Sequence, residues 1–311
     1  MKKFFLALSM IVLFMSTHNN AIAQYYFFDD EYYDSPILYE AGISLNAMNS
    51  LTDIGGTKGI GRKFFKDLNI GYTHASGGVF FSVAYKNAVA LRLEGTFGKI
   101  SANDKVLSNV PVTDIAFERF NRNLNFRSYI SEVALLLEIH PKYIFIDWPA
   151  RDDAPPRTSP YIIAGVGYFS FNPQTKLAGS NRWIDLQPLH TEGQGFAEYG
   201  RKNYNLSQIN IPLGAGLKYE LSPLVNLRGE FVYRKTFTDY IDDLSTTYID
   251  PALFSKYLTP QQEANAKLLY DRQILNHAGI DGKRGTVTNK DAYFTFNLKL
   301  SVVIGRERMR R

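Results

Sequence analysis

Charged side chains in this chain recur two residues apart along several segments, a spacing that places them on one face of an extended strand. Five of them are basic and six are acidic. They are Glu40, Arg92, Glu94, Glu132, Glu138, Lys218, Glu220, Arg228, Glu230, Arg234 and Lys299. Buried charges require partners, and the near-balance of signs allows these side chains to satisfy one another as a network of ion pairs.

A histidine, a serine and an acid lie close in sequence at His190, Glu192 and Ser207. Some lipid-modifying eight-stranded barrels use these residue types near the outer rim, so a rim-located enzyme is one alternative. Such combinations are common in loops, and no catalytic residue is predicted. The other histidines after the leader lack the spacing of metal ligands, and His140, directly before Pro141, is interpreted as a turn residue. No metal or cofactor is predicted.

Acidic residues also gather in the stretch DYIDD, which contains Asp239, Asp242 and Asp243. Carboxylate oxygens could bind calcium there, but the spacing is not that of an EF-hand, and a solvated loop entrance is predicted instead. The glycine-rich run 55–61 (GGTKGIG) lacks the Gly-Lys-Ser/Thr of a phosphate-binding loop and is interpreted as a flexible loop.

The segment 291–306 (DAYFTFNLKLSVVIGR) indicates which kind of element carries the charged face. Apolar residues occupy its even positions from Phe294 to Ile304, and mostly polar residues occupy the odd positions. Strict alternation indicates a strand whose two faces meet different environments. Its length is near the about 9–11 residues that a tilted strand needs to cross a bilayer.

Seven further segments resemble this one and give eight strands, an even number as in outer-membrane barrels. The predicted strands are 39–48, 74–85, 89–100, 127–140, 160–171, 206–221, 225–240 and 291–306. Short connections (86–88, 141–159, 222–224) alternate with long ones (49–73, 101–126, 172–205, 241–290). Alternate connections of a meander lie at opposite ends, so the long loops gather at one end. This asymmetry is typical of short periplasmic turns and long extracellular loops.

The last long loop also contains a helical pattern at 259–278. Thr259 and Gln262 form a capping box, Pro260 suits the first turn, and Gly279 can end the helix.

The first 23 residues have the pattern of a cleaved secretory leader, with Lys2 and Lys3 before an apolar run and a small-x-small site at 21–23. An uncleaved anchor is the alternative, but the apolar run is short for one. The chain has no cysteine, which excludes a lipidated cysteine and disulfides. No later apolar run reaches the about 18 residues of a membrane helix, so an exported chain of this kind spans a membrane only as a closed barrel.

Composition is compatible with such a barrel, because 20 Tyr and 22 Phe can supply interfacial girdles. The formal net charge of +5 is too small to indicate nucleic-acid binding. We predict an all-β, eight-stranded antiparallel transmembrane barrel whose lumen is plugged by the ion-paired face, since eight strands leave just enough room for side chains. A soluble lipocalin-like barrel with the charges outward is the alternative, and strand length, leader and loop asymmetry favour the membrane form.

Six stretches together resemble a known family. They are YEAGISLNAMN (39–49), YKNAVALRLEGTFGKI (85–100), YIIAGVGYFSFNP (161–173), WIDLQPLHTEGQG (183–195), QINIPLGAGLKYELS (208–222) and RKTFTDYIDDLSTTY (234–248). In order and content they resemble the PorG-type outer-membrane barrels associated with the type IX secretion system, over most of residues 38–306. The most specific loop positions are Trp183, Asp185, Gln187, Pro188, Glu192, Gly193, Gln194, Lys235, Phe237, Asp239, Tyr240, Asp242 and Asp243.

The resemblance implies a non-enzymatic subunit of the export machinery that contacts outer-membrane lipids and a periplasmic ring of lipoprotein and partner subunits. The expected organisation is a leader (1–23), a periplasmic stretch (24–37), the barrel (38–306) and a basic tail (307–311). The aromatic, acidic 24–37 and the basic tail are either solvated or dock a periplasmic partner electrostatically. An adhesin-like or membrane-stabilising barrel acting through its loops is the alternative function.

Overall fold

The structure is a computed structural model that describes residues 36–57, 59, 69–145, 156–177, 179–275 and 277–304. The predicted leader (1–23), nearly all of the stretch 24–37 and the tail 307–311 lie outside the described residues, so the expectations for them stay predictions. The run 55–61 is described only in part.

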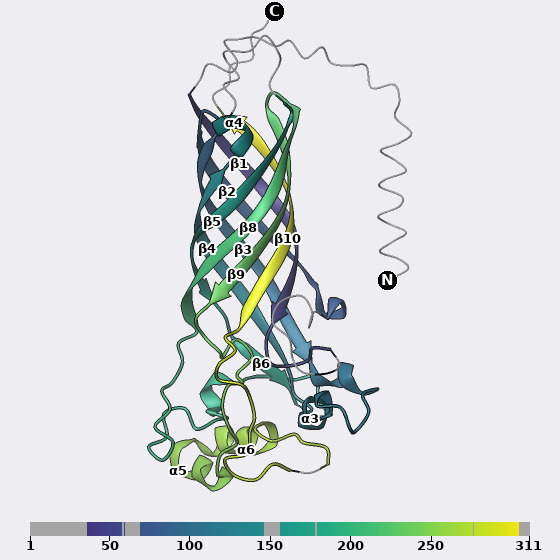
Figure 1. The fold of residues 1–311 in the computed structure, drawn as a ribbon. Coiled ribbons are helices and arrows are strands. Elements are labelled where there is room, and N and C mark those ends of the chain that lie inside the picture. The colour runs from purple at the N-terminus through teal and green to yellow at the C-terminus, as the bar shows by residue number, and fades with distance from the viewer. Residues whose placement is uncertain are drawn as a thin grey trace, which may run out of the picture. The chain divides into compact units, whose positions relative to one another are not determined.

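Eight long strands form a closed antiparallel barrel (Figure 1). They are β1 (Ile37–Leu51), β2 (His74–Tyr85), β3 (Val89–Asn103), β4 (Asn125–Ile139), β5 (Thr158–Ser170), β8 (Ser207–Ser222), β9 (Val225–Thr236) and β10 (Ala292–Ile304). Each strand pairs with its neighbours in the chain, and β10 returns to pair with β1, from Tyr39 opposite Ile304 to Leu51 opposite Ala292. The predicted fold class is therefore confirmed.

The predicted strands agree with the observed ones to within a few residues, because alternation fixed both their faces and their lengths. The largest difference is in the seventh strand, which ends at Thr236 and not at residue 240. The acidic stretch DYIDD therefore begins beyond the barrel strand. The faces of 160–171, which alternation left ambiguous, are now defined: Tyr161, Ile163 and Phe169 are buried inside.

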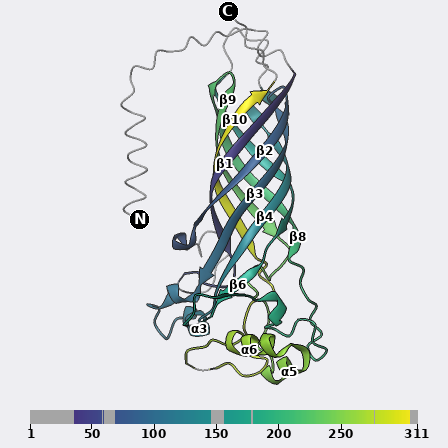
Figure 2. The same cartoon turned by 180° about the vertical axis from the view of Figure 1, so that it is seen from behind.

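The described residues of the four long loops lie at one end of the barrel, and those of the short connections lie at the other (Figures 1 and 2). We call the described residues of the long loops the cap. The cap contains the short strands β6 (Pro173–Lys176) and β7 (Trp183–Asp185) and the helices α3 (Ala116–Arg122), α5 (Phe254–Tyr257) and α6 (Pro260–Leu269). The short-turn end carries α4 (Pro141–Phe145) and the tight turn at Lys86 and Asn87, both with positive φ.

The capping box of the predicted helix is present, since Thr259 Oγ1 accepts from Gln262 N and Gln262 Oε1 accepts from Thr259 N. The predicted end is wrong: α6 stops at Leu269 rather than near Gly279. Ile274 N donates to the carbonyl of Asn121 and Leu275 N to its side chain, so contacts with α3 replace the helical hydrogen bonds of this segment. No helix among the described residues is long and apolar enough to cross a membrane.

Candidate functional site

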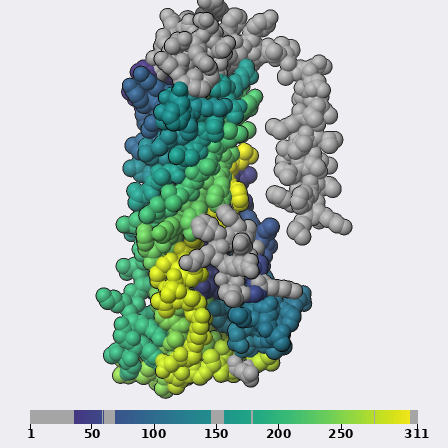
Figure 3. All heavy atoms as spheres, viewed as in Figure 1, coloured from purple at the N-terminus to yellow at the C-terminus, as the bar shows by residue number. Residues whose placement is uncertain are grey.

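The outer wall of the barrel is apolar. Ile43 and Leu45 of β1 are 63% and 67% exposed, and every other barrel strand adds large aliphatic side chains to the same surface. Examples from the other strands are Val79, Leu93, Val133, Ile162, Leu213, Leu227, Leu298 and Leu300. The space-filling view shows this wall as a continuous surface above the cap (Figure 3). Soluble monomers rarely expose apolar patches beyond a few hundred Å².

Exposed aromatic residues lie toward both ends of the wall. Tyr39, Tyr85 and Tyr219 lie near the short-turn end. Tyr129, Tyr168, Phe97 and Phe296 lie nearer the cap. Two aromatic girdles around an apolar band are the surface pattern of a barrel placed in a bilayer.

The interior carries the charges. All eleven charged residues of the predicted lumen set are buried, with none more than 8% exposed. A lipocalin-like barrel needs the opposite orientation, with aliphatic residues inside and charges in water. The soluble alternative is therefore wrong for this chain.

Eight of these residues form one continuous network of ion pairs, which we call the main network. Its members are Glu40, Arg92, Glu94, Glu138, Lys218, Arg228, Glu230 and Lys299. Four are cations and four are anions, so the network is charge-balanced. Balance matters because an unpaired charge at this depth would cost several kcal/mol.

Arg92 lies at the centre of the main network. Its Nε is 3.0 Å from Glu94, and its Nη1 is 2.6 Å from both Glu138 and Glu230. Arg228 links Glu138, at 2.8 Å, to Glu40. Each guanidinium thus bridges carboxylates from different strands, a use for which its fork of donors is suited.

Aromatic residues surround the same charges. The ring of Phe80 lies between 5.1 and 5.6 Å from the cationic centres of Arg92, Arg228 and Lys299. Tyr161 donates its hydroxyl hydrogen to Glu230 at 2.5 Å. The sequence placed Phe80 on the charged face but gave no sign of these contacts, because cation–π pairs join strands far apart in sequence.

A second, smaller group lies nearer the cap. Arg234 Nε is 2.6 Å from Glu132, and Asn210 donates to Glu132 at 2.8 Å and to the hydroxyl of Tyr293 at 2.8 Å. Gly167 has no side chain here because a Cβ would collide with Asn210 and Glu132. Glu220, the remaining member of the predicted set, is also buried.

His140 lies in the turn between β4 and α4, as predicted, and its carbonyl accepts from Tyr143 N, but its side chain is buried in the lumen. It is 2% exposed, its Nδ1 is 2.9 Å from Ser159 Oγ, and its Nε2 is 3.4 Å from Glu138. Its ring stacks on Tyr161, with centroids 4.8 Å apart. The position two residues after Glu138, on the same face of the strand, was the available signal.

An apolar cluster closes the lumen toward the cap. It joins strand residues with residues of the loops. Its buried members are Met48, Ile54, Ile100, Leu124, Phe126, Ile130, Phe169, Phe171, Tyr204, Ile241, Leu244 and Tyr293. The interior is therefore filled by ion pairs along the barrel and by packed rings at the cap.

Glu192 of the HTEGQG motif holds the cap together. It is fully buried, and its oxygens accept hydrogen bonds from Ser245 N at 3.0 Å and from Thr246 N at 2.9 Å. Arg284, from the far end of the last loop, pairs with it at 2.9 Å. Three segments separated by up to 92 residues thus meet at one carboxylate.

Asp243 joins the same two motifs from the other side. Its Oδ2 accepts from the hydroxyl of Thr191 and its Oδ1 from that of Tyr204, both at 2.6 Å. Burial raises the pKa of Asp243 to about 6 although Arg284 lowers it. The DYIDD stretch is therefore a buried junction of the cap, and its interpretation as a solvated loop entrance is wrong.

Three further aspartates lie beside this junction, and with Asp242 they form what we call the acid cluster: Asp53, Asp239, Asp242 and Asp291. Burial raises the pKa of Asp239 to about 7, and burial together with Asp53 and Asp239 raises that of Asp242 well above its usual value. Backbone N–H groups compensate in part, since Ile54 N donates to Asp242 and Ile241 N to Asp291. Among the described residues, no group of three or more His, Asp or Glu is positioned to hold a metal ion.

The other residues of the two motifs serve local structure. The side chain of Gln187 donates to the carbonyl of Tyr204, and the carbonyl of Pro188 accepts from the side chain of Gln262. The side-chain oxygen of Gln194 accepts from Glu192 N. Tyr240 stacks on Tyr204 at 4.6 Å, and Asp185 accepts from Gln174 at 2.6 Å. Gly193 has a φ of 71°. Lys235 and Phe237 are exposed, and Trp183 is half-buried.

Among the described residues, no hydrogen bond joins the His190 ring to Glu192 or Ser207, the other two residues of the enzyme alternative. Glu192, the acid of that set, has its oxygens occupied by Arg284, Ser245 and Thr246. His190 adopts a left-handed backbone conformation, and its ring lies 5.9 Å from that of Phe196. Ser207 begins β8.

Comparison with known proteins adds a fold-level likeness. No protein-family profile matches the chain, and neither does any curated protein. Among solved structures, Ail, the attachment invasion locus protein of Yersinia pestis, is 9% identical, with 86% of this chain and 97% of Ail covered and a TM-score of 0.33. Neisserial surface protein A is 12% identical, and the alignment covers 86% of this chain and 97% of that protein with a TM-score of 0.33. A major outer membrane protein from Thermus thermophilus is 12% identical, and the alignment covers 86% of this chain and 99% of that protein with a TM-score of 0.34.

Proposed function

We propose that this chain is an integral barrel of the outer membrane of a Gram-negative bacterium, exported through a cleaved leader. The observation that carries the proposal is the polarity of the two faces, with aliphatic residues outward and a balanced set of charges inward. Hydrocarbon accepts the first face, and the closed barrel leaves no strand edge without hydrogen bonds. The cap lies on the extracellular side, and the short turns face the periplasm.

Folding in detergent or lipid tests this proposal. The refolded barrel is expected to migrate differently on gels with and without boiling, because ion-paired barrels resist denaturation by the gel detergent until heated. A polypeptide that stays monodisperse in plain buffer would overturn the membrane assignment.

We also propose that the barrel is a non-enzymatic subunit of the type IX secretion machinery and contacts its periplasmic ring of lipoprotein and partner subunits. The family resemblance over residues 38–306 supports this role. The short-turn end offers a contact surface, since Phe145 and Ile144 of α4 are 83% and 48% exposed. The sequence also predicts electrostatic docking by 24–37 and by the basic C-terminal tail, but nearly all of these residues lie outside the described part of the chain.

The ring contact can be tested by affinity purification from detergent-solubilised outer membranes. Compared with the full chain, deletion of 24–37 and 305–311, or the change Phe145→Ser, is expected to lower recovery of the ring subunits and secretion of cargo. Leu268→Ser, an exposed apolar position in the cap, is the matched control. Unchanged recovery and secretion in both the deletion variant and Phe145→Ser would remove the docking proposal.

The packed structure of the cap favours one alternative function. In this alternative the barrel acts through its extracellular loops as an adhesin-like or membrane-stabilising protein. The cap has an apolar core of its own, which includes Leu189, Phe196, Ile249 and Phe254. Loops that serve only as connections do not need such a core. Loop deletions that spare secretion but abolish binding to a surface ligand would favour this alternative.

A further inference from the structure

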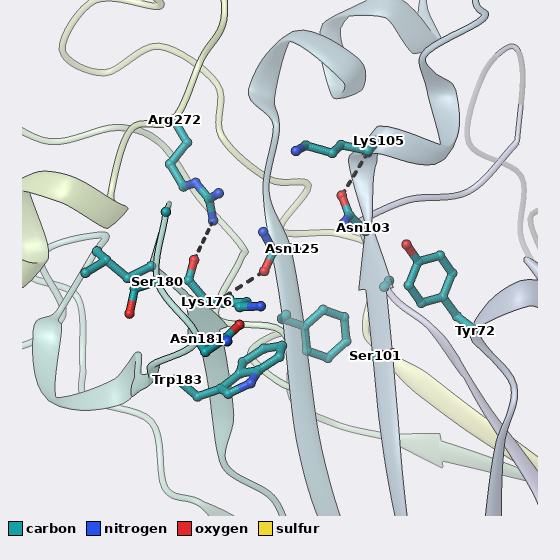
Figure 4. A pocket seen from close by; sticks show the side chains of 14 residues that line it. Tyr72, Ser101, Asn103, Lys105, Asn125, Lys176, Ser180, Asn181, Trp183 and Arg272 are labelled. Atoms are coloured by element: carbon teal, nitrogen blue, oxygen red, sulfur yellow. Dashed lines mark hydrogen bonds between the residues drawn. The ribbon is translucent and has the colours of Figure 1, made fainter.

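A pocket of about 500 Å³ opens on the side of the cap, where β3 leaves the barrel and β4 enters it (Figure 4). Ser101 and Asn103 at the end of β3, Asn125 at the start of β4 and Lys176 at the end of β6 contribute to its walls. Because strand ends form much of the lining, the pocket is held at a fixed place relative to the barrel. It lies just outside the membrane-spanning wall.

The charge of the pocket is one-sided. Lys105, Lys176 and Arg272 line it, and none of its 14 described lining residues is acidic. Within the described part of the chain, none of these three cations makes an ion pair within 4.0 Å, unlike the charges of the lumen. The guanidinium of Arg272 donates to the Thr175 hydroxyl and to the Lys176 carbonyl, at 3.3 and 3.4 Å.

Neutral polar groups and aromatic rings complete the lining. Asn103, Asn125 and Asn181 bring amides to the same space, and Tyr72 and Trp183 bring rings (Figure 4). The guanidinium of Arg127 lies 3.9 Å from the indole centroid of Trp183 and holds this ring in place. In the figure Lys105 and Tyr72 lie on one side of the pocket, and Trp183, Lys176 and Arg272 lie on the other.

We propose that this pocket binds a phosphorylated or sulfated saccharide. Lys105, Lys176 and Arg272 hold the anionic groups, and Trp183 packs against a sugar ring. The N–H groups of the asparagine amides can donate to the hydroxyls of a sugar, while Asn103 Oδ1 accepts from Lys105 N and Asn125 Oδ1 from the Thr175 hydroxyl. A volume of this size holds about a disaccharide, in the range of small-ligand sites. The inference does not depend on the secretion role.

Two sources can supply this chemistry. One is the phosphorylated sugar headgroup of a lipid in the outer leaflet, which would lie beside the barrel at the height of the pocket. The other is a free or polymeric saccharide that carries sulfate or phosphate. Both would use the same cations, so the experiment must separate them.

Binding can be followed by the fluorescence of Trp183 in the Trp148→Phe background, because the chain has only two tryptophans. With the barrel in nanodiscs, persulfated maltose is expected to bind at least tenfold more tightly than maltose itself, since charge-assisted hydrogen bonds to each anionic group are lost without sulfate. Affinity is expected to fall when salt rises, because part of the attraction is between exposed charges.

The variant Lys105→Gln/Lys176→Gln is expected to weaken binding of persulfated maltose at least tenfold, and Arg272→Gln separately to weaken it several-fold. Lys202→Gln/Lys283→Gln, which removes the same charge from exposed cap positions outside the pocket, should stay within twofold of the parent. Gel mobility before and after heating verifies that each variant is folded.

Nanodiscs with bisphosphorylated or dephosphorylated lipid A separate the sources. Competition with persulfated maltose by the bisphosphorylated form alone supports a lipid headgroup, and absence of competition by either form supports a free saccharide. The proposal is overturned if persulfated maltose and maltose bind equally or not at all, or if both pocket variants bind persulfated maltose like the control.

Discussion

Replacing Arg92 by methionine is the sharpest perturbation of the lumen. Methionine keeps much of the side-chain volume but removes the cation that lies 2.6 to 3.0 Å from Glu94, Glu138 and Glu230. Lys299 is then the only cation in the main network that pairs with Glu94 and Glu230, and Arg228 pairs with both Glu138 and Glu40. The main network keeps four anions but only three cations.

The expected cost is about 3–5 kcal/mol of the free energy of unfolding, as for other buried pairs that lose one partner. Equilibrium unfolding in urea of barrels reconstituted in lipid vesicles measures it, with far-ultraviolet circular dichroism and gel mobility as the two probes. Arg182→Met, at an exposed position of the cap, is the control and should change stability by less than about 0.5 kcal/mol.

A second variant separates charge balance from packing. Arg92→Met/Glu230→Gln leaves three cations and three anions in the network and should regain about 2 kcal/mol relative to Arg92→Met alone, within the range measured for coupled neighbours. A loss below about 1 kcal/mol for the single variant would mean that water solvates these charges. A double variant less stable than the single one would refute the argument from charge balance.

Three further predictions concern the cap and the lumen. Arg284→Met should lower the free energy of opening the cap by about 3–5 kcal/mol, because Glu192 loses its buried partner. Proteolysis of the cap should then be faster, while the urea midpoint of the barrel stays unchanged. Equal proteolysis rates for the variant and the parent would contradict this prediction. Burial raises the pKa values of Asp243 and Asp239 to about 6 and 7 in the closed cap, so both carboxyls are protonated below these values. When the cap opens, their pKa values return to about 4, and both carboxyls lose their protons above that pH. Cap stability should therefore fall as pH rises from about 4 to 7, with hydrogen-exchange protection, corrected for intrinsic rates, lower at pH 8 than at pH 5; Asp239→Asn should reduce this dependence, and a rise with pH would refute it. The barrel should also show no stepwise conductance in planar bilayers, because ion pairs and packed rings fill its lumen; a stable ohmic current would show an open path.

The barrel could be predicted from sequence because its determinants are local and repeated. Alternation along β4, for example, places Glu132, Glu138 and the leucines between them on the correct faces without knowledge of any partner strand. The closed ring then follows from the even number of strands and the pattern of loops. What alternation cannot supply is the pairing of charges across the lumen, since Arg92 and Glu230 are 138 residues apart.

The cap could not be predicted for the same reason. The sequence predicts a solvated acidic stretch at 239–243, because its spacing is not that of a calcium-binding loop, yet the stretch is buried by Glu192, Thr191 and Tyr204 from another loop. The segment after Leu269 looked helical because its local propensity is good, yet α3 offers its backbone better partners. Both errors arise where contacts distant in sequence override local preference.

The most specific residues of the family resemblance, in the HTEGQG and DYIDD stretches, include side chains that are buried inside the cap. Glu192, Asp242 and Asp243, within the most specific runs, are at most 1% exposed. Side chains enclosed in this way cannot touch a partner, so these residues stabilise the cap and do not form a binding surface. Under the proposed secretion role, contacts with a periplasmic ring would be made by exposed residues of the short-turn end, such as Phe145. Changes in the cap motifs should therefore loosen the cap without lowering ring binding, whereas changes at the short-turn end should lower ring binding at a constant amount of barrel.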